Sequence, residues 1–476
     1  MGTSSLLSIA LCSLLLFNVC FAQVEQLRRS QQQRPQSERW RTECRLQRLN
    51  ALKPSRQVRS EAGNSEYWDV EQEDQLQCAG FSAARHTIQQ RGLLLPSFVN
   101  APDLFYVLQG RGIHGAVFPG CPETFESAPS QSREGRQESQ RSGDEHQKVR
   151  QIQQGDIVAV PAGVTQWVYN DGNSPLVLIS FMDVGNQANQ LDISTRRFHL
   201  AGNPRKEQQS QKQQQDRHSS PRRQEGRRGQ QESNGNNIFS GFDEKLLAEA
   251  FNVDVELARK LQNEDDNRER IVRVKDEFQI MSPGRRQEEG QSERDYNGIE
   301  ETFCTLRLRQ NIDRPSEADI FNPRGGRITT VDRRQLPILQ ALQLSAERGV
   351  LYRNALVAPH FNSKSHSVIF VTDGSGRLQI VDDNGNNVFD GELQEGQLLV
   401  VPQNFAVIKR AGDRGFKWIA VKSSDNPQRT PLAGRISVIR GLPNNVLENA
   451  FNLSEDEAQN LKYNREEVTI FSPNRD

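Results

Sequence analysis

Six cysteines and seven histidines are the residues of this chain best suited to covalent or metal chemistry. Four of the cysteines follow residue 22, namely Cys44, Cys78, Cys121 and Cys304. In a chain that enters the secretory pathway, an even number of cysteines predicts two disulfides, for which three connectivities are possible. No pair has the C-x-x-C spacing that is typical of zinc sites, so we expect structural disulfides and no metal.

The first 22 residues predict entry into the secretory pathway. They carry no charge, contain an apolar run and end in the small residue Ala22. This pattern is typical of a cleaved signal peptide, with cleavage between Ala22 and Gln23. No later stretch is apolar for 18 residues, so we expect no membrane-spanning segment.

The bond between Asn297 and Gly298 has two interpretations. Asn-Gly is a strong signal for a β-hairpin turn, but a hairpin needs alternating apolar residues on both sides. Upstream lies "QEEGQSERDY", which is polar throughout. Because proteases act on exposed, mobile backbone, the sequence favours a proteolytic processing site over a hairpin.

Signatures of catalysis and of nucleic-acid binding are absent from the sequence. There is no G-x-S-x-G, no Walker A motif and no H-E-x-x-H. The formal net charge is −1, so no strongly basic face is expected and nucleic acid is not a predicted partner. A net charge near zero instead favours self-association.

The elements that would hold these residues come in two copies. "YVLQGRG" at 106–112 resembles "FVTDGSG" at 370–376, and "GDIVAVPAG" at 155–163 resembles "GQLLVVPQN" at 396–404. The segment "EAFNVDVELARKLQ" resembles "NAFNLSEDEAQNLK". The chain therefore contains an internal duplication, with polar insertions in the first copy.

Each copy predicts short strands followed by helices. Asn384-Gly385 lies between two apolar runs and predicts a hairpin turn. Apolar residues at three- and four-residue spacing predict helices after the strands, and Ser454 with Glu457 predicts a capping box. The fold class expected is mainly β, with two jelly-roll β-barrels, each followed by an α-helical arm.

The pattern "GDIVAVPAGVTQWVYN" resembles the second motif of the cupin family. It reads G-x5-P-x-G-x2-Q-x3-N and places Gln166 where that motif has a metal-binding His, with Asn170 at its end. In the second copy Val407 takes the same place. The first cupin motif supplies two histidines and a carboxylate; here only His360 and His366 remain, with Asn362 in place of the second His. Since a metal oxidase needs about three histidines and a carboxylate around one ion, we expect no metal and no cofactor.

Taken together, these motifs and "NGIEETFCT", "NALVAPHFN" and "FHLAGNP" resemble the legumin-type (11S) seed storage globulins. The resemblance implies cleavage after Asn297 by an asparaginyl endopeptidase, and disulfides Cys44–Cys78 and Cys121–Cys304. It further implies trimers of the precursor, hexamers after cleavage, and transport through the endoplasmic reticulum to the protein storage vacuole. Loops rich in Gln, Asn and Arg suit a nitrogen store and are not expected to fold on their own.

The domain organisation expected is given by six segments. They are a signal peptide (1–22), an N-terminal arm (23–43), a first cupin domain with its helical arm (44–265, with flexible inserts at 122–150 and 202–237), a connecting strand segment (266–282), a flexible linker (283–297) and a second cupin domain with its arm (298–476). Two rival functions remain open at this point. A metal-dependent cupin oxidase would hold one tightly bound metal per chain, and a small-molecule receptor would be stabilised by its ligand.

Overall fold

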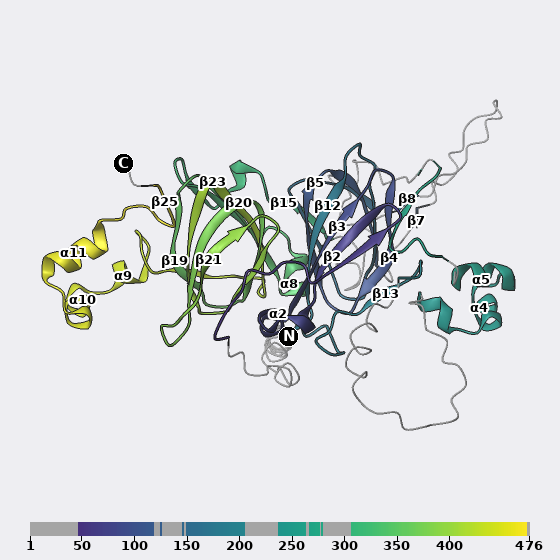
Figure 1. Ribbon diagram of the computed structural model, residues 1–476, viewed down its shortest axis with the longest axis horizontal. Helices are drawn as coiled ribbons and strands as arrows, with labels where there is room; N and C mark the ends of the chain where they lie inside the picture. Colours follow the sequence, from purple (N-terminus) through teal and green to yellow (C-terminus); the bar gives the residue numbers. More distant parts are fainter. Residues whose placement is uncertain are drawn as a thin grey trace, which may run out of the picture. The chain divides into compact units, whose positions relative to one another are not determined.

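The computed structural model is mainly β and describes residues 46–118, 124–125, 145–146, 149–204, 237–262, 266–276, 278 and 306–473. Figure 1 shows the strands gathered into two β-barrels, with pairs of short helices beside them. Two jelly-roll barrels, each followed by a helical arm, confirm the fold class predicted from the sequence.

The first barrel is built from two antiparallel sheets. One has the strand order β1-β2-β3-β12-β5-β10-β15 and the other β13-β4-β11-β6-β9, with β14 also paired to β4. The strands of the first sheet are β1 (Arg56–Ser60), β2 (Gly63–Trp68), β3 (Phe81–Ile88), β12 (Leu176–Asp183), β5 (Asp103–Gln109), β10 (Asp156–Val160) and β15 (Arg309–Asn311). Those of the second are β13 (Arg197–His199), β4 (Gly92–Val99), β11 (Thr165–Tyr169), β6 (Arg111–Val117), β9 (Val149–Gln153) and β14 (Ile271–Arg273).

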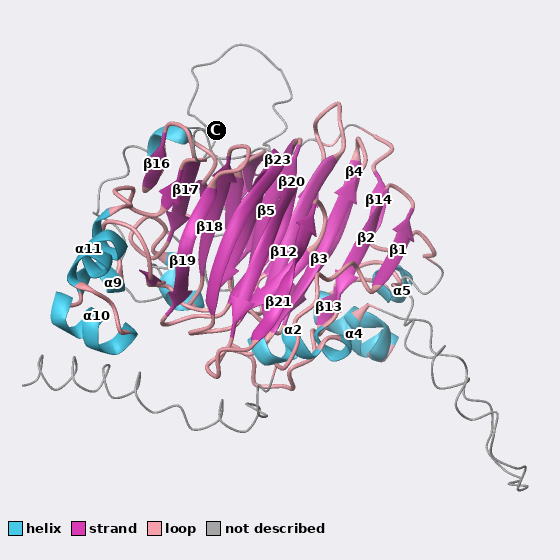
Figure 2. Ribbon diagram, turned by 60° about the vertical axis from the view of Figure 1, so that its left-hand side comes forward, coloured by secondary structure: helices cyan, strands magenta, loops and turns pink. Residues whose placement is uncertain are grey.

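The second barrel is one ten-stranded sheet, seen from another side in Figure 2. Its path runs β16-β17-β18-β23-β19-β24, and β20 pairs with β21, β22 and β23. Its strands are β16 (Ile320–Asn322), β17 (Gly326–Val331), β18 (Ser345–Leu351), β19 (Leu356–Asn362), β20 (Ser367–Val381), β21 (Asn387–Gln394), β22 (Leu398–Val401), β23 (Ala406–Lys422), β24 (Arg429–Pro431) and β25 (Ile470–Phe471). The connection from β20 to β21 contains Gly385 at φ 77°, which confirms the predicted hairpin.

The helices form an arm after each barrel, with shorter helices elsewhere. In the first arm Asp243 caps α4 by accepting from the backbone N–H groups of Lys245 and Leu246. In the second, Ser454 and Glu457 complete the predicted capping box. The helices are α2 (Asp74–Ala79), α4 (Glu244–Phe251), α5 (Val255–Gln262), α8 (Ile338–Leu342), α9 (Val438–Gly441), α10 (Asn444–Phe451) and α11 (Glu455–Tyr463), with 3-10 turns at Val70–Gln72, Ile238–Gly241 and Pro315–Glu317.

Burial alternates from one residue to the next along the second half of strand β4. Leu95, Ser97 and Val99 are buried, whereas the residues between them are partly exposed. This period of two places alternate side chains inside the barrel. By contrast, all five residues of β10 are buried, because its outer face joins a core shared with α8 and with strands of the second barrel.

Two segments cross between the barrels. Strand β15, which belongs to the part of the chain expected as the second domain (298–476), pairs with β10 of the first barrel. In the other direction, Leu52 bridges to Leu398, and the Leu49 N–H donates to the Val388 carbonyl oxygen in the second barrel. The barrels therefore do not divide the chain cleanly at residue 298.

The polar insert expected at 122–150 contains some regular structure. Strands β7 (Thr124–Phe125) and β8 (Glu145–His146) pair with each other, and β9 begins at Val149. Among the described residues, no helix is both long and apolar enough to cross a membrane.

Candidate functional site

Gln166 joins a chain of hydrogen bonds inside the first barrel. Its Nε2 donates to Asp103 Oδ2 at 3.0 Å, and its Oε1 lies 3.2 Å from His114 Nε2. Ser180 Oγ donates to the other oxygen of Asp103. All four side chains are at least nine-tenths buried, so this position of the cupin motif has become part of a polar core.

Burial disfavours the charged forms of both His114 and Asp103. It lowers the pKa of His114 to about 4, although the hydrogen bond to Gln166 opposes this shift. It raises the pKa of Asp103, while Arg197, Ser180 and Gln166 act in the opposite direction. His114 is therefore neutral at physiological pH and can serve as the donor to Gln166.

Asn170 closes a turn. It is fully buried, and its Nδ2 donates to the carbonyl oxygens of Ile88 and Ser174 at 2.8 and 2.9 Å. Its Oδ1 accepts from the Gly172 N–H. Every polar atom of this side chain is used to hold backbone, so Asn170 has a structural role here.

In the second barrel, His360 and Val407 lie directly opposite each other on β19 and β23. The His360 Nδ1 bonds to the Ala358 carbonyl oxygen at 2.7 Å, and Val407 is buried in the apolar core. His366 lies before β20 and accepts from the Gln403 N–H. The structure therefore keeps the two motif positions adjacent, but only one of them carries a ligand atom.

A buried ion cluster surrounds Glu347 in the second barrel. Its carboxylate lies 2.7 Å from Lys422 Nζ, 2.5 Å from Arg429 Nη2 and 3.9 Å from Lys409 Nζ. Lys422 also donates to Asn362 Oδ1 at 3.2 Å, which accounts for the Asn at the second motif position. We define these four charged residues as the Glu347 cluster.

The charges of the Glu347 cluster depend on one another. Burial alone would raise the pKa of Glu347, but Arg429, Lys422 and Lys409 hold it well below its ordinary value. Burial lowers the pKa of Lys409 to about 7, opposed by the charge of Glu347. Burial and the charges of Arg429 and Lys409 also keep His360 neutral.

Neither barrel fits the metal ion of the cupin family. Among the residues that the structure describes, no three His, Cys, Asp or Glu side chains converge as ligands. In the first barrel, the amide of Gln166 is hydrogen-bonded both to Asp103 and to His114. In the second, Val407 offers no ligand atom, and the cations near His360 would repel a metal ion.

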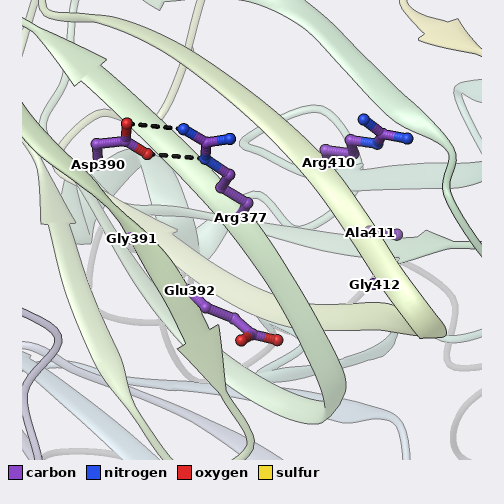
Figure 3. Close-up of a pocket in the computed structure, with 7 residues that line it drawn as sticks. All are labelled: Arg377, Asp390, Gly391, Glu392, Arg410, Ala411 and Gly412. Atoms are coloured by element: carbon purple, nitrogen blue, oxygen red, sulfur yellow. Dashed lines mark hydrogen bonds and ion pairs between the residues drawn. The ribbon is translucent and has the colours of Figure 1, made fainter.

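A pocket lies on the outside of the second barrel, across β20, β21 and β23 (Figure 3). Its volume is about 420 Å³, and its charged groups include an exposed bidentate ion pair between Arg377 and Asp390, with both N–O distances 2.8 Å. Glu392 and Arg410 line the rest. No nucleophile or buried acid lies in it, so its surface offers no catalytic arrangement.

The remaining predicted site residues lie outside the described ranges. These are Ala22, Gln23, Cys44, Cys121, Asn297, Gly298 and Cys304. Cys78 is described, half-buried in α2, and is disulfide-bonded. Its partner is not among the described residues, so both disulfide pairings stay predictions.

Asp103, His114 and Glu347 were not foreseen from the sequence, and neither was Lys409. A signal existed for Lys409, because it follows Val407 by two residues on one strand and so shares its inward face. Asp103 stands at the start of β5, which is otherwise mostly apolar. Nothing local in the sequence marks Glu347 as the partner of three cations from β23 and β24.

The family model described as Cupin matches residues 49–206 and 310–459. Both copies are therefore cupin domains, and the chain is a two-barrel member of that class.

Cocosin 1 of Cocos nucifera is 50% identical over 479 residues, which cover 100% of this chain and 99% of that protein. The 11S globulin seed storage protein Ana o 2.0101 of Anacardium occidentale is 48% identical over 478 residues, 98% of each chain. The solved structure of recombinant pro-11S globulin of pumpkin has a TM-score of 0.77 and 47% identity, and covers 91% of this chain and 100% of that one. The chain belongs to the 11S, legumin-type family of seed storage globulins, and its role is storage, not catalysis.

Proposed function

We propose that this protein is a seed nitrogen store made as a precursor and packed as hexamers. The signal peptide ends at Ala22, and the chain passes through the endoplasmic reticulum to the protein storage vacuole. There an asparaginyl endopeptidase cuts between Asn297 and Gly298. The disulfide Cys121–Cys304 then joins the two pieces, while Cys44–Cys78 fastens the N-terminal arm.

The observation that carries the assembly proposal is the apolar surface of both helical arms. Phe251 at the end of α4 and Phe451 at the end of α10 are 51% and 54% exposed. Leu246 and Val446 occupy matching places five residues earlier and are also exposed. Large exposed apolar surfaces of this kind are typical of protein–protein contacts.

The buried faces of the two arms support this argument. Leu247 and Leu447 at matching positions are buried, as are Ala258 and Ala458. Each helix pair therefore already packs one face against itself and leaves a second apolar face uncovered. We infer that the arm of the first barrel contacts the arm of the second barrel in a neighbouring chain. A head-to-tail contact closes into a ring of three when each contact rotates the next chain by a third of a turn, as the proposed trimer requires.

The test replaces the exposed aromatic residues of both arms. Phe251→Glu and Phe451→Glu should each yield folded monomers, because a charge on either side of the same contact is costly to bury. Analytical ultracentrifugation of the precursor measures the result, with Leu191→Glu as a control at an exposed apolar residue outside both arms. Trimers formed equally well by both arm variants would exclude this interface.

A further inference from the structure

A small cavity lies in the first barrel, between β3, β4 and β13. Its volume is about 10 Å³, roughly the space that one water molecule needs. His86, Ser97 and His199 are each more than nine-tenths buried. These three residues line the cavity with Arg197, Arg270, Leu94 and Leu95.

Two guanidinium groups at this cavity lack a carboxylate partner. Arg197 donates to Ser97 Oγ at 3.2 Å, and Arg270 donates to Tyr67 Oη at 2.5 Å. Within the described ranges, neither has an acidic side chain within 4.0 Å, and the buried Nε of Arg270 has no hydrogen-bond partner. Asp103 stabilises the charge of Arg197 electrostatically, but its oxygens accept from Ser180 and Gln166.

Two neutral imidazoles complete the lining. Burial, followed by the charges of the two arginines, lowers the pKa of His86 to about 3 and that of His199 to about 2. His86 uses Nδ1 in a 2.8 Å bond with Ser65 Oγ, and the His199 ring has no partner among the described residues. Each neutral ring carries one N–H, whose position depends on the tautomer, and the two arginines give the cavity a positive potential.

The second barrel shows what normally balances such an arginine. Arg197 lies opposite Val99 on β4, and Arg429 lies opposite Asn362 on the corresponding strand β19. Arg429 is neutralised by Glu347, which stands in "LSAER". The first copy reads "FSAAR" at this point, so Ala84 replaces the glutamate. The first barrel therefore has Arg197 in the place of Arg429 and a second arginine, Arg270, but no carboxylate in the place of Glu347.

We propose that the cavity binds one small inorganic anion of chloride size, which replaces the missing carboxylate between Arg197 and Arg270. A halide accepts hydrogen bonds from any direction and is close in size to one water molecule, whereas an organic carboxylate or an aromatic acid is much larger than the cavity. An anion between two partly buried guanidinium groups offsets their mutual repulsion, and the interaction is stronger there than in bulk water. The anion thus acts as a structural ligand of the folded barrel.

The first experiment measures the Tm of the full-length protein in sodium bromide, with sodium gluconate keeping the ionic strength constant. The expected result is a saturating rise of about 3 °C at a hundredfold excess over Kd. Ala84→Glu places a carboxylate next to Arg197 and should abolish the rise. Arg377→Gln removes an exposed arginine on the second barrel and should leave it unchanged. A rise that persists in Ala84→Glu, or a wild-type Tm indifferent to bromide, overturns the proposal.

The second experiment needs no variant and covers the case in which Ala84→Glu does not fold. Crystals of the wild-type protein soaked in sodium bromide should give an anomalous peak within hydrogen-bond distance of Arg270 Nε. No such peak is expected at Arg429, where Glu347 is already present. Anomalous maps without a peak in the cavity of the first barrel would show that it holds water.

Discussion

Glu347 illustrates how a buried charge survives at the scale of single residues. Its carboxylate is 2% exposed, which in isolation would be costly, and two lysines and an arginine surround it. In the first barrel, the buried carboxyl group of Asp103 accepts hydrogen bonds from Ser180 and Gln166. The two cupin barrels thus hold two different polar cores.

Lys409→Met should change how stability depends on pH. The pKa of Lys409 is about 7 in the folded protein and higher when the chain unfolds, so protonation opposes folding. Below pH 7 the penalty is complete, and it disappears as pH rises towards the unfolded pKa. Wild-type stability should therefore rise relative to the variant, on the order of 1 kcal/mol per pH unit between pH 7.5 and 9.5.

Urea unfolding at these two pH values gives the comparison. Lys417→Met is the control, since Lys417 lies on the same strand but is 43% exposed and paired with Asp373. If the difference in unfolding free energy between wild type and Lys409→Met is equal at both pH values, Lys409 carries its proton throughout.

Helix ends decide the geometry at the scale of elements. Both arms turn at an asparagine in the left-handed conformation, Asn252 with φ 52° and Asn452 with φ 55°. Each asparagine ends the first helix of its pair, so that the second helix folds back. Because both copies end the first helix in this way, the two arms have matching apolar surfaces.

Ser454→Ala should loosen the last helix of the second arm. Ser454 Oγ accepts from the Glu457 N–H at 3.3 Å, and Glu457 accepts from the Ser454 N–H at 2.8 Å. Loss of this cap should cost about 1 kcal/mol of local stability. Amide hydrogen exchange in α11 measures the change, and Glu455→Ala, in the same turn without a capping bond, is the control. Equal protection in both variants would mean that packing alone holds α11.

At the scale of the whole molecule, each of the two barrels contains a segment from the other half of the chain, and these segments join the barrels. Strand β15 extends a sheet of the first barrel, where the Arg309 guanidinium lies 2.9 Å from the fully buried Asp156 carboxylate. Leu308 and Ile312 belong to the same core. In the other direction, Leu49 is packed in the core of the second barrel. The part of the chain before the proposed cleavage site therefore contributes a segment to the second barrel, and the part after it contributes β15 to the first barrel.

Cleaved protein should stay associated after its disulfides are reduced. The exchanged strand and its buried ion pair remain when the proposed Cys121–Cys304 bond is broken, so gel filtration in reducing, native buffer should give one species. Denaturing electrophoresis with reductant should give two pieces. Pieces that separate in native buffer would show that the disulfide, and not the exchange, joins them.

Asn297→Gln tests the proposed processing step. The longer side chain should fit an asparaginyl endopeptidase poorly, and a change outside the barrels usually alters stability little. The variant should remain one chain in reducing denaturing gels and stop at the trimer in ultracentrifugation, whereas treated wild type should reach the hexamer. Hexamers of the uncut variant would show that cleavage does not control assembly.

The sequence by itself determined the features that depend on local patterns. The duplicated blocks, the hairpin at Asn384-Gly385, the capping box at Ser454 and the loss of metal ligands at Gln166 and Val407 each follow from a few adjacent residues. Legumin-type membership followed from the same short motifs, with no knowledge of the contacts between them.

Only the tertiary structure decided which polar residues share a barrel interior. Asp103 meets Gln166, and Glu347 meets Lys422, across strands far apart in the chain. The pairing of β15 with β10 crosses the expected domain boundary in the same way. Such contacts depend on strand register and on the burial of the whole barrel, because a period of two says which face a side chain occupies but not which partner it finds there.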